Sequence, residues 1–536
     1  MIARPKGLTL AAVVAEQAAV TPDHPAILFR DVCLSYGALN ADMRAAAKGL
    51  LALGVTPGQR IGILIGNTPE WVVMALAASA IGVTLAPLNS WYKPAELAWT
   101  MRHCGLTAIV AARTFLKTDY GTVFTDLLPA LKHRLPDPAF PRLRTLVLIG
   151  DTVAGAIDWG QFLDGGAAIS DPQLDTAMAA VDPDSPAYVL YTSGSTAEPK
   201  GVLLCHRGVV GNGFDLGQRR GIGPGDRTWL GTPLFYALGA TNALPATLTA
   251  GATLVLQGAF EAGAALDTIE RTRATVYYGT GNMSRALLDH PAFAPDRVAS
   301  LKKGNAGLGA EYKRLTLIEL GITGAVPAYG LTETYGNAAV GWHDDPLDVK
   351  LATDGVALPG IEIRIVDPET DAPRGPGEIG LIQIRGHVTL GYLDNPEETA
   401  KALRPDGFFD TGDLGTLDPE GRLCFHSRLK DVIKSGGINV SPIEVEQLLV
   451  THPDVRDAHV VGVADPIRGE LIVAFVDPFV PVAEPLLQAH VKQRAASFKV
   501  PHHIFFRNEA ALPRLATGKI AKVALREEAR RLLDLA

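Results

Sequence analysis

Short apolar runs alternate with helical patterns through the part of the chain that precedes Lys430. The runs are rich in Val, Ile, Leu and Tyr, which is typical of strands buried on both faces of a sheet. Helical patterns such as residues 39–53 alternate with these runs along the chain. This alternation predicts an α/β fold with largely parallel sheets, in which ligands bind beyond the carboxyl ends of the strands. The runs predicted as strands are 60–66, 145–150, 187–193, 252–258 and 274–280.

The most apolar stretch of the chain, residues 71–88, is long enough to suggest a membrane span. Gly82 and Pro87 interrupt it, and alanine is its commonest residue. We therefore expect a buried helix over 71–81 followed by a buried strand over 83–88, and no integral membrane association. The N-terminal segment has one short apolar patch without a clear cleavage site, so we expect no signal peptide.

The pattern changes after Gly360, where short twisted strands joined by Gly/Pro turns are expected. Ser441, Pro442 and Glu444 read as the N-cap, N1 and N3 positions of a helix, with Glu444 closing a capping box. Strands over 458–463 and 471–476 and a helix over 484–496 are expected to follow. We place a boundary near Lys430, which predicts an N-terminal domain of residues 1–429 and a small α+β domain of residues 430–536.

Composition narrows the class of protein. The 536 residues are 47% hydrophobic and 20% charged, as in globular proteins, and the formal net charge is −8. Nucleic acid is an unexpected partner because no long basic run is present, so an anionic ligand would be held by local groups. Cys33, Cys104, Cys205 and Cys424 lack metal-ligand spacing and are expected to be reduced thiols in the cytoplasm.

The segment 191–201, YTSGSTAEPKG, is the strongest chemical signal. Its glycine, its hydroxyls and its lysine can form a concave site for phosphate directly after the strand 187–193. The segment does not match the Walker A pattern. By itself, a loop rich in Ser, Thr and Gly is as often a flexible turn as a phosphate site. Its candidate phosphate-binding residues are Thr192, Ser193, Gly194, Ser195, Thr196 and Lys200.

Five further segments follow in a particular order: GNAGLG (304–309), PAYGLTET (327–334), FFDTGDLG (408–415), SRLKDVIKSGGINVSPIEVE (427–446) and PRLATGKI (513–520). Together with 191–201, they resemble the adenylate-forming (AMP-binding) enzyme superfamily in its acyl- and aryl-CoA synthetase branch. The resemblance extends from about Leu8 to Leu533. It implies a large N-terminal domain of α/β subdomains plus a distorted β-barrel, and a small mobile C-terminal lid domain.

The resemblance also implies an activity. Such an acid–CoA ligase joins a carboxylate to ATP as an acyl-adenylate, releases pyrophosphate, and then forms a thioester with CoA and releases AMP. ATP, Mg²⁺ and CoA are the implied cofactors and co-substrates. A carboxylate is already ionised at neutral pH, so positioning and electrostatic stabilisation are required rather than a general base.

Roles in the first half-reaction follow from the same resemblance. The loop 192–200 would hold the β- and γ-phosphates, Thr332 the α-phosphate and Glu333 the Mg²⁺ ion. The catalytic set is Lys519, Glu333 and Thr332, where Lys519 would bridge the attacking carboxylate and the α-phosphate. Without the resemblance, Glu333 and Lys519 would be read as solvated surface residues. The rest of the nucleotide set is Gly307, Tyr329 against adenine, Gly330, Asp413 at the ribose hydroxyls, and Arg428; the alternative for Tyr329 is an ordinary core aromatic.

The second half-reaction would use another face of the small domain, by resemblance alone. Rotation about the hinge residue Lys430 would remove Lys519 and bring in the loop 435–439. Ser435, Gly436 and Gly437 would line a narrow tunnel for the pantetheine of CoA, where side chains larger than glycine would block the passage.

The acid is expected to be bound by a small, mostly apolar wall. This composition favours a neutral aryl, alicyclic or medium-chain acid; the alternative is a polar or dicarboxylic acid held by a residue that the sequence does not identify. No aspartate is available in 235–240 for a substrate ammonium, which argues against an amino acid. The wall implied by the resemblance comprises Tyr236, Leu238, Gly239, Thr280, Met283, Asn305, Ala306, Gly330 and Asn337.

Three positions depart from the family pattern: Ser195 replaces a threonine, Ala197 a glycine and Tyr236 a histidine. The serine keeps a hydroxyl, the alanine restricts the loop, and the tyrosine leaves any imidazole role in doubt.

Four other functions remain open or disfavoured. An adenylation enzyme that loads the pantetheine of a carrier protein would need the same residues. A luciferase-like oxygenase and a non-catalytic nucleotide-binding protein rank lower, and a hydrolase is disfavoured because no G-x-S-x-G elbow occurs. The expected partners are the acid, ATP and CoA, and a homodimer is left open.

Overall fold

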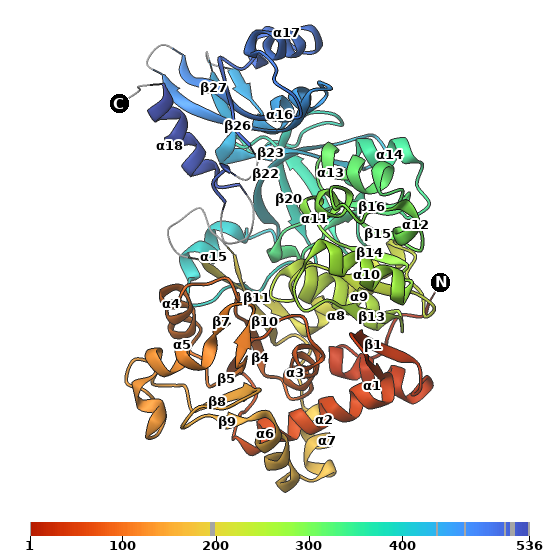
Figure 1. Ribbon diagram of the computed structural model, residues 1–536, viewed down its shortest axis with the longest axis vertical. Coiled ribbons are helices and arrows are strands. Elements are labelled where there is room, and N and C mark those ends of the chain that lie inside the picture. The colour runs from red at the N-terminus through yellow and green to blue at the C-terminus, as the bar shows by residue number, and fades with distance from the viewer. Residues whose placement is uncertain are drawn as a thin grey trace. The chain divides into compact units, whose positions relative to one another are not determined.

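The computed structural model describes residues 2–192, 199–435, 438–465, 468–508, 511–514 and 520–533. The chain forms two compact units (Figure 1), which are described one at a time. Unit 1 comprises Met1–Leu308, Tyr312–Glu362 and Ile384–Phe409, and unit 2 comprises Gly309–Glu311, Ile363–Gln383 and Asp410–Ala536. Residues 363–383 and 410–429 therefore belong to the same unit as the C-terminal residues. The predicted hinge at Lys430 stays a prediction.

A nine-stranded sheet forms one half of unit 1. Its central strands are parallel, and antiparallel strands close both edges. The parallel interior agrees with the apolar runs in the sequence, because buried parallel strands are apolar on both faces. In spatial order the strands are β18 (Val356–Ala357), β17 (Ala339–Val340), β16 (Gly324–Tyr329), β15 (Lys303–Gly307), β14 (Val276–Tyr278), β12 (Arg227–Leu230), β13 (Thr253–Leu256), β1 (Pro25–Phe29) and β2 (Val32–Ser35).

An eight-stranded sheet forms the other half of unit 1. Strands from β10 to β9 are parallel, whereas β11 and β21 join one edge in antiparallel orientation. This edge matters most for the site, because the segment 191–201 connects β10 to β11. In spatial order the strands are β21 (Gly391–Tyr392), β11 (Lys200–Cys205), β10 (Pro186–Thr192), β4 (Thr84–Pro87), β3 (Arg60–Leu64), β5 (Ala108–Ala112), β8 (Thr145–Ile149) and β9 (Ile157–Asp158).

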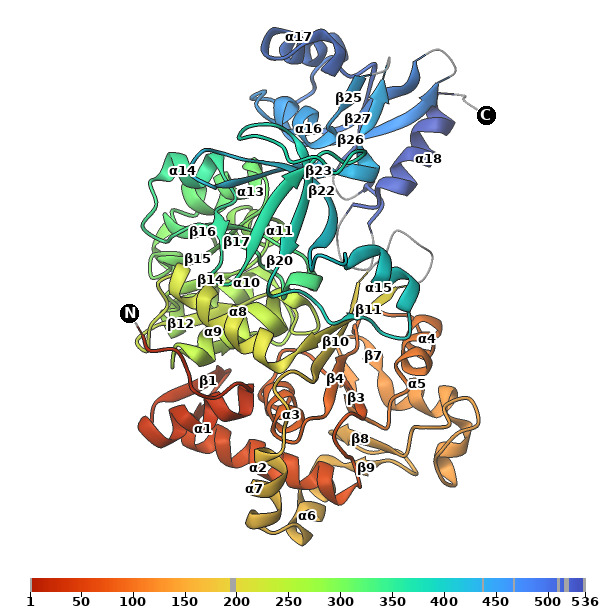
Figure 2. The same ribbon diagram turned by 180° about the vertical axis from the view of Figure 1, so that it is seen from behind.

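The first two helices of unit 1 begin at hydroxyl caps. Thr9 caps α1 (Leu10–Val20) and Ser35 caps α2 (Tyr36–Ala52) with their side-chain oxygens. These two helices pack with α3 (Pro69–Ala80), as Figures 1 and 2 show at the red end of the chain. Further helices of the unit are α4 (Pro94–Cys104), α7 (Asp171–Ala179), α8 (His206–Arg219), η3 (Leu238–Ala243), α9 (Leu244–Thr249), α10 (Ala262–Thr272), α11 (Gly281–Leu288) and α15 (Pro396–Ala402).

The apolar stretch 71–88 forms a core helix and a strand, as predicted. Every residue of α3 except Glu70 is buried, and β4 follows within the eight-stranded sheet. A helix that is apolar on all sides fits a position inside a large core. Within the described ranges, every helix is too short or too polar to cross a bilayer.

Unit 2 contains two sheets. One has the order β19 (Glu362–Val366), β20 (Gly380–Arg385), β22 (Phe409–Leu417), β23 (Leu423–Arg428). Across the described residues this sheet is open, so the expected distorted barrel is corrected to an open sheet, because β19 and β23 stay at its edges. The α/β class itself is confirmed.

The second sheet of unit 2 carries the C-terminal helices. It contains β24 (Ile433–Ser435), β25 (Ile438–Val440), β26 (Val455–Asp465), β27 (Gly469–Pro478) and β28 (His503–Phe506), with α16 (Pro442–Val450), α17 (Glu484–Arg494) and α18 (Lys522–Leu532). Ser441 caps α16 as predicted. The prediction that Glu444 closes the capping box is wrong, because its carboxylate instead accepts a hydrogen bond from Lys499 Nζ.

Each of the four cysteines, all of which lie in the described ranges, is a free thiol. Cys104 and Cys205 are buried, as expected for structural thiols.

Candidate active site

The phosphate-loop candidate is the connection of a β-hairpin. Thr192 and Lys200 face each other as the last register pair of β10 and β11. Because β10 runs parallel to β4, β10 ends with Thr192 at the carboxyl edge of the parallel strands. Ser193, Gly194, Ser195 and Thr196 lie outside the described residues, so the loop is represented by its two ends.

The Lys200 side chain has two neighbours at this edge. Its Nζ lies 2.5 Å from Glu398 Oε2 on α15 and 5.0 Å from the centre of the Tyr392 ring on β21. Figure 2 shows α15 beside β11. The Lys200 ammonium, followed by that of Lys401, lowers the pKa of Glu398 to about 2. The ammonium is thus held in place at the base of the hairpin.

Tyr392 connects Lys200 to the predicted magnesium ligand. Its hydroxyl donates a hydrogen bond of 2.9 Å to Glu333 Oε1, and the backbone N–H of Thr389 donates to Glu333 O at 2.6 Å. Burial, followed by the negative charge of Glu333, raises the pKa of Tyr392, so this hydroxyl keeps its proton. The structure therefore brings Lys200 and Glu333, which are far apart in sequence, to one tyrosine: the ammonium lies over its ring and the carboxylate bonds its hydroxyl.

Tyr392 and Glu398 are site residues that the sequence analysis missed. Strand β21 is only two residues long, and it is placed by the register pair of Val202 with Tyr392. A short strand of this kind has no periodicity to read. A glycine before an aromatic residue, as in Gly391–Tyr392, is the one weak local signal.

The segment 329–337 holds Glu333 by close packing. A Cβ on Gly330 would lie 2.4 Å from Asn337 Cα and 2.6 Å from Gly336 O, so this position requires glycine. The carbonyl of Tyr335 accepts hydrogen bonds from Thr241 Oγ1 at 2.8 Å and Asn242 Nδ2 at 2.7 Å. The turn is thereby tied to η3, which belongs to the predicted acyl wall.

The remaining nucleotide residues of unit 1 lie in this segment and at the end of β15. Tyr329 is the last residue of β16 and is buried, while Thr332 is half-buried in the short helix η5 (Thr332–Thr334). Gly307 ends β15 with a φ of +79°, a conformation that favours glycine. The contact of Tyr329 with adenine stays a prediction.

The magnesium expectation can be tested against the donor set. Among the described residues, no group of three His, Cys, Asp or Glu side chains could hold a metal ion. Glu333 is a single carboxylate whose second oxygen is not used by Tyr392. Mg²⁺ usually keeps several waters and binds through one or two carboxylates plus substrate phosphates. Glu333 fits an ion that arrives with a nucleotide.

The predicted acyl wall divides into a half-buried and a buried part. Tyr236, Leu238, Thr280 and Met283 are half-buried. The Tyr236 ring packs on Phe235 and Trp91, and its hydroxyl accepts a bond of 3.4 Å from Asn89 Nδ2. An aromatic group thus fills the position where the family pattern has a histidine.

The buried part of the wall is more polar than the sequence indicates. Asn337 Nδ2 donates to Asn242 Oδ1, and Asn305 Nδ2 donates to the carbonyl of Gly279 at 3.1 Å. Ala306 packs into the hydrophobic core around Trp229, on the face opposite to Asn305, because neighbouring strand residues point to opposite faces. Gly239 is also buried, and a Cβ there would lie 2.6 Å from Pro233 O.

The other predicted residues belong to unit 2. Asp413 and Arg428 are register partners in β22 and β23, with 3.4 Å between Asp413 Oδ1 and Arg428 Nε. The Asp413 side chain is 4% exposed and that of Arg428 49%. Lys430 is exposed in η6 (Leu429–Asp431), and Ser435 is buried at the end of β24. Gly436, Gly437 and Lys519 lie outside the described residues.

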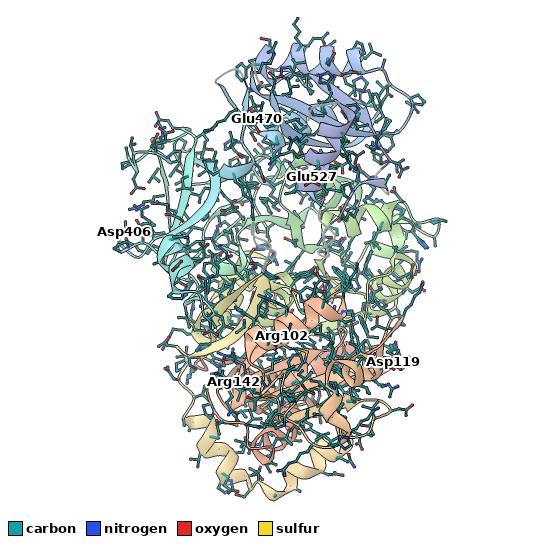
Figure 3. All side chains as sticks on the ribbon, turned by 90° about the vertical axis from the view of Figure 1, so that its left-hand side faces the viewer. Arg102, Asp119, Arg142, Asp406, Glu470 and Glu527 are labelled. Carbon is teal, nitrogen blue, oxygen red and sulfur yellow. The ribbon has the colours of Figure 1, made fainter. Side chains whose placement is uncertain are left out.

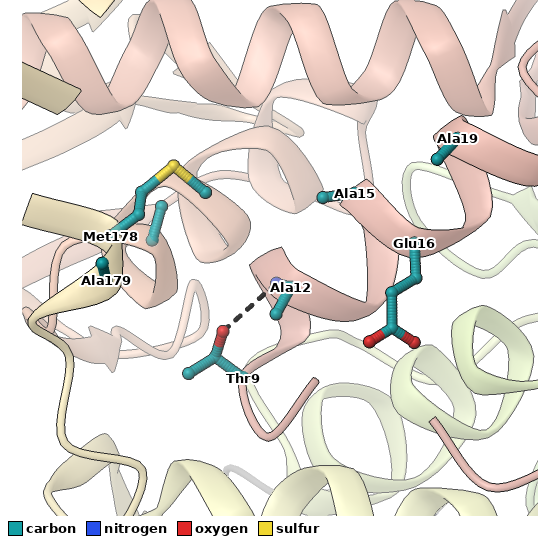
Figure 4. Close-up of a pocket in the computed structure, with 8 residues that line it drawn as sticks. Thr9, Ala12, Ala15, Glu16, Ala19, Met178 and Ala179 are labelled. Carbon is teal, nitrogen blue, oxygen red and sulfur yellow. Dashed lines mark hydrogen bonds between the residues drawn. The ribbon is translucent and has the colours of Figure 1, made fainter. Parts of the chain in front are cut away.

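Two surface hollows of unit 1 lie elsewhere. One, of about 490 Å³, lies between α1 and α7 and is lined mainly by alanine with Thr9, Glu16 and Met178, which Figure 4 labels. Its lining residues include no cation. The other, of about 330 Å³, is lined by Arg60, Arg102 and Arg142, the last two labelled in Figure 3. Neither contains a predicted site residue.

Comparison with known proteins identifies the family of the chain. The family model for AMP-binding enzymes matches residues 14–393, and that for the AMP-binding enzyme C-terminal domain matches residues 444–519. The chain is 35% identical over 505 residues to the 3-[(3aS,4S,7aS)-7a-methyl-1,5-dioxo-octahydro-1H-inden-4-yl]propanoyl:CoA ligase of Rhodococcus jostii, covering 93% of this chain and 94% of that protein. It is 31% identical over 526 residues to the mitochondrial medium-chain acyl-CoA ligase ACSF2 of Homo sapiens, covering 95% and 85%. The structure of ATP-bound MatB from Rhodopseudomonas palustris matches with a TM-score of 0.85 at 26% identity, covering 98% of this chain and 99% of that one.

Proposed function

The chain belongs to the AMP-binding enzyme family, and on that premise we propose that it is an acid–CoA ligase. In the proposed reaction the carboxylate of an acid attacks the α-phosphorus of ATP, which gives an acyl-adenylate and pyrophosphate. The thiol of CoA then attacks the acyl carbon, which gives a thioester and AMP. The observation that carries the proposal is the placement of Lys200 and Glu333 around Tyr392 at the hairpin edge.

The proposed first step depends on charge placement. Lys200 and the hairpin hydroxyls would neutralise the β- and γ-phosphates, and Glu333 would bind the Mg²⁺ that accompanies them. Tyr392 would keep the Glu333 carboxylate turned toward this ion through its 2.9 Å hydrogen bond. Lys519 would add the positive charge that the transition state needs between carboxylate and α-phosphate.

The proposed ribose contacts and the second step use residues of unit 2. Asp413, paired with Arg428, would accept hydrogen bonds from the ribose hydroxyls. Lys430 would serve as the hinge about which residues 430–536 rotate between the steps, and Ser435, Gly436 and Gly437 would line the pantetheine tunnel.

The relatives' names support an acid with a compact hydrocarbon body. One is named for an alicyclic propanoyl group and another for medium-chain acids. The half-buried Tyr236, Leu238 and Met283 offer apolar surface for such a body. We therefore propose an alicyclic, aryl or medium-chain acid as the substrate.

A pyrophosphate-release screen tests the proposal. The full chain is incubated with ATP, Mg²⁺ and CoA across a panel of carboxylic acids, and thioester formation is followed by mass spectrometry. We expect acid-dependent pyrophosphate release and a matching acyl-CoA. If pyrophosphate is released but the thioester forms on a carrier protein and not on CoA, the acceptor is the carrier protein and the proposal of CoA is wrong. Absence of release with every acid would overturn the proposed activity.

A further inference from the structure

Arg220 is a buried cation beside the predicted acyl wall. It follows α8, is 0% exposed, and donates from Nη2 to Asn305 Oδ1 at 3.2 Å. Its guanidinium also lies 4.4 Å from the centre of the Tyr278 ring. Across the described residues, Nε and Nη1 have no hydrogen-bond partner, and no carboxylate lies within ion-pairing distance.

Burial of this kind is costly for a guanidinium. An isolated buried charge is strongly unfavourable unless it is paired, and arginine remains charged at neutral pH. Tyr278 does not supply the missing negative charge, because burial raises the pKa of its phenol and keeps it neutral. The bond to Asn305 and the contact with Tyr278, including its neutral hydroxyl, therefore leave Arg220 without a counter-charge among the described residues, and Nε and Nη1 without a hydrogen-bond acceptor.

Arg219 provides a contrast within the same chain segment. Its Nη1 and Nη2 donate to the carbonyls of Val340 and Ala357 at 3.2 and 2.9 Å, and its guanidinium lies 4.1 Å from the centre of the Trp342 ring. The two adjacent arginines thus differ in how many of their hydrogen-bond donors the protein satisfies. The donors of Arg219 are used by the fold, whereas most of those of Arg220 are not.

The position of Arg220 relates it to the acyl site. Its bonding partner Asn305 is a predicted wall residue, and Asn305 Nδ2 donates to Gly279 O immediately before Thr280, another wall residue. Tyr278 is the last residue of β14, which runs parallel to β15. The guanidinium therefore lies near the carboxyl ends of two parallel strands, where α/β sheets bind ligands.

We propose that Arg220 determines substrate specificity by binding an oxygen acceptor at the end of the acid remote from the reacting carboxylate. The acceptor is a second carboxylate or a ketone oxygen, either of which can accept hydrogen bonds from Nε or Nη1. A second carboxylate would in addition neutralise the buried charge. This inference rests on the proposed function and names its substrate class: an acid with an alicyclic or chain body and a distal carboxylate or keto group.

The test compares three series of straight-chain acids of equal length that end in a methyl group, a ketone or a second carboxylate. Each is measured by pyrophosphate release with the wild-type protein and with Arg220→Met, which keeps volume and removes the donors. We expect the wild type to favour acceptor-bearing acids by about tenfold to a hundredfold in kcat/KM, the range of a hydrogen bond to a charged group. Arg220→Met should lose this preference through a higher KM, with methyl-ended acids unaffected or improved. Preference for the ketone series or for the dicarboxylic series identifies which acceptor is used.

The control variant is Arg207→Met, which removes an exposed α8 arginine paired with Asp184 and should leave selectivity unchanged. Thermal unfolding gives a readout independent of turnover. The acceptor-bearing acid should raise the Tm of the wild type and not that of Arg220→Met. Without ligand, Arg220→Met should unfold at the same or a higher temperature, because the substitution removes a charge whose unpaired burial is costly.

Three outcomes would overturn the inference. Equal kcat/KM for the three series, an unchanged preference in Arg220→Met, or a large loss of ligand-free stability in that variant would each show that Arg220 is structural. If Arg220→Met does not fold, Arg220→Lys is measured instead and should weaken the preference while keeping part of it. Failure of every acid to release pyrophosphate would instead refute the proposed function, so the two failures are distinguishable.

Discussion

Lys200 and Glu398 are 198 positions apart in the chain, and their side chains form an ion pair with 2.5 Å between Nζ and Oε2. One residue begins β11 and the other lies in the first turns of α15. The pair holds the ammonium beside the ring of Tyr392, whose hydroxyl bonds Glu333. The cation and the carboxylate proposed for the triphosphate and its metal ion are therefore positioned by one connected set of side chains.

The first prediction concerns this ion pair and pH. The pKa of Glu398 is about 2 in the folded protein, below the ordinary value, so the pair stabilises the fold above about pH 4.5. Its contribution is lost as pH falls from there toward 2. Because the pair is partly exposed, we expect Glu398→Gln to cost at most about 1 kcal/mol at pH 5.5. Urea unfolding between pH 5.5 and 3 should show that the difference in unfolding free energy between the wild type and Glu398→Gln becomes smaller as the pH falls. The control is Glu397→Gln. A difference that grows toward low pH would contradict the assignment.

The second prediction concerns the hydroxyl of Tyr392. Tyr392→Phe removes the donor to Glu333 Oε1 and should lower kcat/KM for Mg·ATP about tenfold, the lower range for a hydrogen bond to a charged group. The Mg²⁺ concentration needed for half-maximal pyrophosphate exchange should rise. Tyr188→Phe is the matched control, because the buried Tyr188 hydroxyl of β10 has no partner among the described residues. Equal effects of the two changes would argue against an orienting role for Tyr392.

The third prediction concerns the close packing at Gly330. Gly330→Ala places a methyl group 2.4 Å from Asn337 Cα, so the backbone must shift. We expect a loss of about 1–3 kcal/mol in unfolding free energy together with weaker adenylate formation, because Thr332 and Glu333 follow directly. Gly165→Ala is the control, since its φ is −57° and a Cβ there meets nothing within 4 Å. Unchanged stability in Gly330→Ala would show that this turn tolerates a side chain.

The fourth prediction separates the two half-reactions at Lys519. Lys519→Ala should lower pyrophosphate exchange by about 10²–10³-fold, as expected for loss of a group that stabilises transition-state charge. Thioester formation from supplied acyl-adenylate should continue. Equal loss in both assays would contradict the proposal that Lys519 serves only the first step.

The fifth prediction reverses this pattern at Gly437. Gly437→Leu should leave pyrophosphate exchange intact and stop thioester synthesis, because a leucine would block the proposed pantetheine tunnel. Gly437→Ala should have an intermediate effect on the thioester step. A collapse of exchange in Gly437→Leu would remove the tunnel assignment.

Strand and helix positions in the large unit were largely predictable. The run 145–150 is β8 at Thr145–Ile149, and the stretch 71–88 divides into α3 and β4 as expected. Continuous apolar runs are reliable here because both faces of these strands are covered. Strands β17, β18 and β21 were not predictable. Each is only two residues long, so it shows no periodicity, and its position depends on pairing with a neighbouring strand.

The site was predictable only in part. Thr192, Lys200 and Glu333 lie in motifs that can be read from the chain, and the structure brings Lys200 and Glu333 to the same tyrosine. Tyr392 was missed because register pairing with β11 brings it to the hairpin, and Glu398 because the following helix α15 carries it there. Glu444 was assigned to a capping box, yet Lys499 from another element takes its carboxylate, which local spacing does not reveal.

The sequence by itself determined the α/β class, the family and the order of the motifs, because apolar runs and glycine-rich turns are local properties of the chain. Tertiary structure decided which polar groups meet. It paired Lys200 with Glu398, placed Tyr392 against Glu333, and buried Arg220 against Asn305 without a counter-charge. Those relationships depend on strand register and on the packing of distant elements, and the cost of burying charge makes them informative about the ligand.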